Sequence, residues 1–176
     1  MSLDAARKEA ARVAAHVDLR DVRLWGVQAD LDSVPDQGDS QFSFRFNADV
    51  QVQHSSEHEV VLVLGTYSLA VTSDVVPPSD EDESEDVAAT LGDSESRQSV
   101  PKDIASIDFR LNALFRVERQ PDDPFTESEL TAFGQTTGQF ALYPYAREFI
   151  ADMTGRMGLP PLHVGVMRLH LESRDD

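Results

Sequence analysis

Residues 42–52, FSFRFNADVQV, alternate apolar and polar side chains at every step. The apolar positions are Phe42, Phe44, Phe46, Ala48, Val50 and Val52. Successive side chains of a β-strand point to opposite faces, so this period of two predicts a strand with one apolar and one solvated face. The apolar face has to be covered by another layer of structure.

Strand-like segments lie on both sides of this stretch. After a polar turn at 54–59, residues 59–73 are apolar on both faces in their first half, which is typical of a more central strand. Residues 104–118 alternate again, and residues 19–34 are strand-like before a turn or crossover at 35–40. Consecutive strands joined by turns favour an antiparallel sheet.

An acidic segment interrupts the strands. Residues 74–99 contain nine acids against Arg97, so they carry −8 of the total charge of −17 and leave −9 for the rest. Repelling carboxylates, serines and prolines do not form packed structure, so we expect a disordered loop insertion over residues 74–102.

Helical patterns occupy both ends of the chain. Residues 1–17 predict an amphipathic N-terminal helix, because their apolar positions repeat at helical spacing. Thr126 with Glu129 three residues later forms a capping box that predicts a helix start. A further helix is expected to begin near Leu142, with Pro144 in its first turn and Gly155 or Gly158 ending it. Its predicted inward face contains Leu142, Tyr145, Ala146, Phe149, Ile150, Met153 and Met157.

These elements predict an α+β fold in a single domain, residues 1–176. Its four-stranded antiparallel sheet would carry helices on one face, and an N-terminal helix would extend it. The tail after Pro161 is expected to be a last strand or a stub of helix.

Composition excludes several functional classes. A charge of −17 repels nucleic acid. The chain has no cysteine, which removes disulfides and thiol chemistry and fits a reducing compartment. The first residues do not resemble a signal peptide, and no run reaches the roughly 18 apolar residues of a membrane span. We therefore expect a cytoplasmic protein without membrane insertion.

The search for catalytic motifs is negative. The chain has no G-x-S-x-G, G-x-x-x-x-G-K-[ST] or G-x-G-x-x-G sequence. His54 and His58, with Glu57 and Glu59, lie in a predicted polar turn, where a solvated hairpin is favoured over a zinc site. We expect no enzyme activity, no cofactor and no metal. A structural role in the core accounts for most of the aromatic and methionine side chains, and adaptable binding is the alternative.

The stretch LYPYAREFIADMTGRMGLPPL, residues 142–162, resembles the signature of the SecB family of protein-export chaperones. The matching positions are Leu142, Pro144, Tyr145, Ala146, Arg147, Glu148, Arg156, Pro160 and Leu162, and Tyr143 replaces a phenylalanine. The resemblance covers roughly residues 18–165. With the acidic insertion and the N-terminal helix, the chain is similar to actinobacterial SecB-like chaperones, some of which accompany toxin–antitoxin pairs.

This resemblance implies an ATP-independent holdase built as a homotetramer, a dimer of dimers. It also implies apolar grooves for unfolded clients, which would be a cognate antitoxin, exported precursors or both. The implied groove residues are Leu31, Val34, Phe42, Phe44, Phe46, Leu142, Tyr143, Tyr145, Phe149, Met153 and Met157. Tyr145 is expected to pack inward and Tyr143 to form a groove wall. The motor SecA would dock on Asp21 and Asp108, although Trp25 occupies a third position that is acidic in the family.

One alternative stays open. A dedicated adaptor could recognise a single partner through the acidic surface, without general chaperone activity. Binding through charges weakens steeply with salt, whereas the binding of clients in an apolar groove is little affected.

Overall fold

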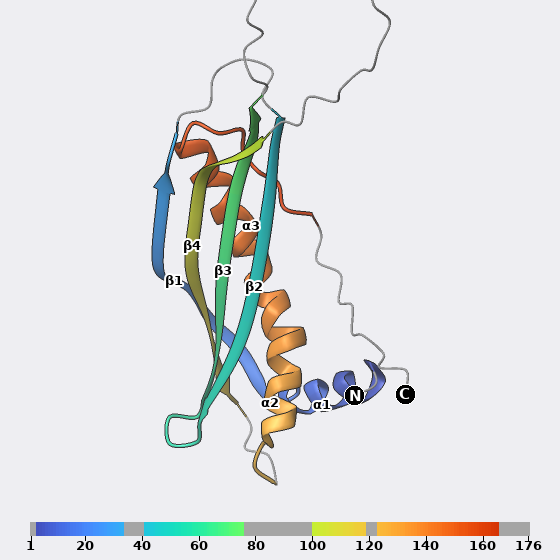
Figure 1. Cartoon of the computed structure of the whole chain (residues 1–176). Helices are drawn as coiled ribbons and strands as arrows, with labels where there is room; N and C mark the ends of the chain where they lie inside the picture. The colour runs from blue at the N-terminus through green and yellow to red at the C-terminus, as the bar shows by residue number, and fades with distance from the viewer. Residues whose placement is uncertain (1–2, 34–40, 76–99, 119–122, 166–176) are drawn as a thin grey trace, which may run out of the picture.

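The computed structural model describes residues 3–33, 41–75, 100–118 and 123–165. Within these residues, the strands are β1 (Val17–Leu31), β2 (Gln41–Ser55), β3 (Val60–Val75) and β4 (Val100–Val117). They form one antiparallel sheet in the order β1–β4–β3–β2 (Figure 1). The expected four-stranded antiparallel sheet is confirmed, with β1 and β2 at its edges.

The central position predicted for residues 59–73 is confirmed in β3. Val61 and Val63 are fully buried on one face, and Leu62 and Leu64 are half-buried on the other. The boundaries predicted for the acidic insertion are wrong at both ends, because Val75 pairs with Val100 and the ladder continues from there into both strands. The rest of the insertion, residues 76–99, lies outside the described residues.

The helices lie against one face of the sheet, called here the inner face. They are α1 (Leu3–Ala14), α2 (Glu127–Phe133), the π-helical segment η1 (Gly134–Gly138) and α3 (Gln139–Arg156). In Figure 1, α3 runs along the sheet, packing on β3 and β4, while α1 lies beside α2 at one end. The predicted N-terminal helix is confirmed, and it buries Ala6, Ala10 and Val13.

The capping box predicted at Thr126 is present. The Glu129 backbone N–H donates to Thr126 Oγ1 at 3.3 Å, and the Thr126 N–H donates to the Glu129 carboxylate at 2.9 Å. Arg12 of α1 donates to both oxygens of the same carboxylate, at 2.6 and 2.7 Å. Glu129 therefore caps α2 and ties the N-terminal helix to it.

The prediction of a separate helix starting near Leu142 is wrong. Backbone angles stay right-handed helical through Gly134, Gly138 and Gln139, so α2, η1 and α3 form one continuous helix. Pro144 consequently lies inside a helix and not in its first turn. The helix tolerates it because Pro144 and Phe140 are both exposed, and water can hydrate the carbonyl that lacks a donor.

Two glycines explain the irregular middle of this helix. A Cβ on Gly134 would lie 2.2 Å from Val52 Cγ2, and a Cβ on Gly138 would lie 2.8 Å from Val63 Cγ1. The π-helical turn therefore brings its backbone directly against β2 and β3, an approach that only glycine allows.

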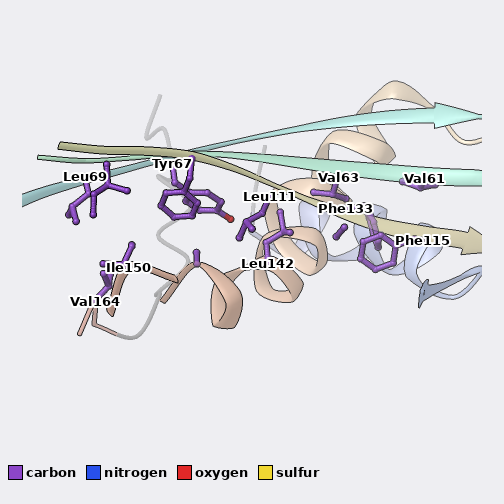
Figure 2. Packing of buried hydrophobic residues seen from close by; sticks show 14 of the residues in the cluster. Val61, Val63, Tyr67, Leu69, Leu111, Phe115, Phe133, Leu142, Ile150 and Val164 are labelled. Carbon is purple, nitrogen blue, oxygen red and sulfur yellow. The ribbon is translucent and has the colours of Figure 1, made fainter. Parts of the chain in front are cut away.

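The core fills the space between the inner face and the helix (Figure 2). Figure 2 shows Phe115, Phe133, Val61 and Val63 toward one end, and Leu69, Ile150 and Val164 toward the other. An aromatic row connects β2 to α3. Its ring centroids are 6.0 Å apart for Phe46 and Tyr67, 4.9 Å for Tyr67 and Phe109, and 4.6 Å for Phe109 and Phe149.

The helix ends at Arg156. Gly158, one of the two predicted stops, follows with a left-handed φ of 78°. Residues 161–165 have no regular structure, so the expected last strand or helix stub is absent from the described tail, while residues 166–176 lie outside it. No helix in the described part of the chain is both long and apolar enough to span a bilayer.

Candidate functional site

An apolar groove lies where the start of β2 faces the chain that follows α3. Phe42 and Phe44 of β2 form one wall, 37% and 49% exposed. The opposite wall is the segment Leu159–Leu162, and Val71 and Thr154 also contribute. The cavity has a volume of about 150 Å³. We call this site the Phe44 groove.

Hydrogen bonds hold the second wall against the helix. Thr154 Oγ1 accepts from the backbone N–H of Leu162 at 3.0 Å, and it donates to the Ile150 carbonyl at 2.8 Å. The Leu159 N–H donates to the Thr154 carbonyl at 3.0 Å. Further along, the Tyr143 hydroxyl donates to the Gly165 carbonyl. The Pro160–Pro161 pair is thereby folded back beside α3 as a fixed wall.

The groove contains no ionisable side chain among its described lining residues. Its surface consists of phenylalanine rings, aliphatic side chains and prolines, together with the Thr154 hydroxyl, which is already hydrogen-bonded. Ser43 lies between Phe42 and Phe44, so its side chain points to the other face of the sheet. No cluster of three or more His, Cys, Asp or Glu that could hold a metal occurs in the described ranges. The groove can therefore bind apolar segments, and it offers no group for acid–base or metal chemistry.

Known proteins resemble this chain in sequence and in fold. The SecB-like chaperones MT2006 and Rv1957 of Mycobacterium tuberculosis are each 36% identical over 164 residues, covering 89% of this chain and 81% of theirs. The chain belongs to the SecB-like chaperones. A scan against protein-family models finds no match.

A solved structure agrees with this assignment. It is that of the Mycobacterium tuberculosis Rv1957 SecB-like chaperone in complex with a ChAD peptide from the Rv1956 HigA1 antitoxin. The match has a TM-score of 0.71 and 29% identity, covering 93% of this chain and 99% of that one. The predicted SecB-like family, fold and link to toxin–antitoxin chaperones are confirmed.

The structure brings only some of the predicted groove residues together in this SecB-like chaperone. Phe42 and Phe44 share the Phe44 groove. Phe46 is half-buried and stacked on Tyr67. Phe149, Met153 and Met157 are half-buried as well and pack on the core.

Three helix residues differ from expectation. Leu142 is fully buried and belongs to the core, because the helix rotates this position onto the sheet. Tyr145, predicted to pack inward, is 45% exposed. Tyr143, predicted as a groove wall, is half-buried, and its hydroxyl holds the Gly165 segment instead.

Leu31 lies far from the Phe44 groove. The ladder aligns Leu31 with Ala105, Ala105 with Val71, and Val71 with Phe44, so Leu31 and Phe44 stand at opposite edges of one row. Three strand spacings separate them by about 14 Å. Val34 lies outside the described residues.

The wall Leu159–Leu162 was missed from sequence. Its signal was the pair of leucines around two prolines immediately after a helix stop, which was interpreted only as a terminator. Apolar residues next to a helix stop pack back on that helix when a glycine such as Gly158 reverses the chain.

The acids suggested for SecA docking lie on the outer face of the sheet, away from the helices. Asp21 is opposite Leu114 and Asp108 is six residues further along β4, so about 20 Å separates them. Asp21 is half-buried and forms an ion pair with Arg23, whereas Asp108 is exposed.

Proposed function

We propose that this SecB-like chaperone is an ATP-independent holdase whose Phe44 groove binds apolar segments of unfolded or aggregation-prone proteins. The observation that carries the proposal is the exposure of Phe42 and Phe44 in a groove without ionisable side chains. An acidic chain of net charge −17 keeps such complexes soluble by mutual repulsion. Binding without catalysis is the activity that this site supports.

The related structure supports a proposal for the client class. Because Rv1957 is seen with an antitoxin peptide, we propose that a cognate antitoxin segment is one client here. Exported precursors are the second client set, and recovery of many precursors with the chaperone from its native cell would favour it. Recovery of one small DNA-binding protein would favour the antitoxin.

We further propose a homotetramer in the cytoplasm. On the inner face of β1, apolar side chains are left uncovered, since α3 packs on β3 and β4. Leu19, Leu24, Val27 and Leu31 are 41–49% exposed there. Contact with another copy would cover them. The expected mass is close to four times 19.5 kDa, measured by light scattering.

Aggregation assays test the function. The chaperone should suppress aggregation of several unrelated unfolded proteins without nucleotide, and high salt should change this little, because apolar contacts are weakly screened. Suppression for one partner alone, lost steeply with salt, would instead support the acidic adaptor. No suppression of any client would overturn the proposal.

SecA docking on Asp21 and Asp108 remains a prediction. A docking partner would have to compete for the Asp21 carboxylate, because Asp21 already forms an ion pair with Arg23.

A further inference from the structure

The outer face of the sheet carries a second cavity, unrelated to the Phe44 groove on the inner face. Its volume is about 210 Å³, several times the roughly 30 Å³ that one water occupies in the liquid. Trp25, Leu62, Asn112 and Leu114 line it, with Asp21 and Arg23 beside them.

A bulge places Trp25 at this cavity. The ladder between β1 and β4 shifts register between Leu24 and Gly26, so Trp25 has no partner opposite it. Because Leu24 faces inward, Trp25 lies on the outer face, and the residue is 65% exposed there. A large exposed aromatic side chain beside a concave surface is a feature of binding sites.

Asn112 forms the polar part of the lining. Asn112 is only 5% exposed, and neither its Nδ2 nor its Oδ1 has a hydrogen-bond partner among the described residues. A buried amide left unpaired is unfavourable, so Asn112 calls for a partner from outside the described residues. Another amide supplies an acceptor and a donor side by side in the arrangement that matches both groups of Asn112.

The charge of the cavity lining indicates which charge its ligand should have. The Asp21 carboxylate and the Arg23 guanidinium neutralise each other, and the remaining lining is uncharged. A neutral ligand therefore fits this site better than the basic partner that the acidic chain as a whole would attract.

We propose that this cavity binds a neutral segment of a partner protein, in which an amide pairs with Asn112 while a neighbouring apolar side chain packs on Trp25 and Leu114. The amide is a glutamine or asparagine side chain or a peptide group. This docking site is separate from the client groove and goes beyond the holdase function.

Trp25 reports on the site directly, because it is the only tryptophan in the chain. The experiment titrates the full-length protein with the blocked dipeptide N-acetyl-leucyl-glutaminamide and follows Trp25 emission. The expected result is a saturable blue shift, weakened about tenfold in Asn112→Leu by loss of the amide pair. The glutamate counterpart of the dipeptide should bind more weakly than the glutamine form.

Controls separate binding from folding. Asn112→Leu should unfold at the same or a higher denaturant concentration than the wild type, since it removes unpaired polar atoms. Asn47→Leu, on the same face of β2, should keep the wild-type titration, and so should Phe44→Ser on the client groove. Absence of a saturable shift in the wild type overturns the proposal, as does equal affinity in Asn112→Leu. Emission that responds only to dilution also overturns it, because a second copy then fills the site.

Discussion

The side-chain oxygen of Thr154, in the last turn of α3, accepts a hydrogen bond from the backbone N–H of Leu162 at 3.0 Å. Leu162 lies eight positions after Thr154, and Pro160 and Pro161 are among the residues between them. Their contact folds the chain back along the helix and sets Leu159–Leu162 opposite Phe44. This buried hydroxyl, on a residue that is 1% exposed, is therefore one of the groups that position the wall of the groove.

Replacing this hydroxyl tests its role. Thr154→Val keeps the shape of the side chain but leaves the Leu162 N–H without its acceptor, so we expect a stability loss of about 1 kcal/mol and weaker client binding. Urea unfolding and client titration measure the two effects. Thr131→Val, exposed on α2, is the matched control. Unchanged client affinity in Thr154→Val would show that the wall does not depend on this bond.

The close approach of η1 to the sheet predicts a strong effect at Gly134. Gly134→Ala brings a Cβ to 2.2 Å from Val52 Cγ2, so the packed neighbours must move, at a cost of about 1–3 kcal/mol. In Gly155→Ala the nearest atom is Pro161 Cγ at 3.9 Å, and the better helix propensity of alanine should raise stability by up to about 1 kcal/mol. Thermal unfolding of both variants gives the comparison. Equal melting temperatures would contradict the packing described for η1.

The link between α1 and α2 depends on pH. Hydrogen bonds from Arg12 and from the Thr126 backbone hold the pKa of Glu129 below its ordinary value of 4.5. A lowered folded-state pKa contributes stability that is present above the unfolded value and is lost as pH falls through the folded one.

Glu129→Gln should consequently flatten the acid limb of the stability curve and lower stability at neutral pH by about 1 kcal/mol. Urea midpoints measured from neutral pH down to about pH 3 report this. Glu127→Gln, at an exposed position in the same first turn of α2, serves as control. An acid limb identical to that of the wild type would rule out this coupling.

The hydroxyl of Tyr67 is a buried polar group whose removal should not lower stability, unlike the groups in the preceding variants. Burial raises the pKa of Tyr67 to about 12, and its Oη finds no hydrogen-bond partner in the part of the chain that the structure describes. Tyr67→Phe should therefore preserve stability or raise it by up to about 1 kcal/mol. Tyr143→Phe, which loses the bond to the Gly165 carbonyl, should lower it slightly. Reversal of this order in denaturant unfolding would mean that Tyr67 has a partner in solution.

The strands and the capping box were predictable from sequence because their signals are local. Alternation in residues 42–52 directly reflects the two faces of a strand, and Thr126 with Glu129 satisfies donors within a single turn. The SecB-like signature supplied the family for the same reason, as its residues lie within one short stretch, 142–162.

The groove was harder to predict, because exposure depends on which element covers which. Leu142 and Tyr145 lie in one helical run, yet the register that Gly134 and Gly138 impose buries the first and exposes the second. Leu31 and Phe44 both face inward, but the strand order places two strands between them. Such relations arise from tertiary packing and are not visible in local patterns.

The most direct test of client binding in the Phe44 groove compares substitutions at two adjacent residues of β2 whose side chains point to opposite faces of the sheet. Phe44→Ser removes a half-exposed wall of the groove, whereas Arg45→Ser changes the outer face one residue away. Affinity for an unfolded, aggregation-prone client should fall about tenfold or more in Phe44→Ser and stay at the wild-type value in Arg45→Ser, with both proteins folded. Equal affinities of the two variants for that client would contradict the assignment of client binding to the Phe44 groove.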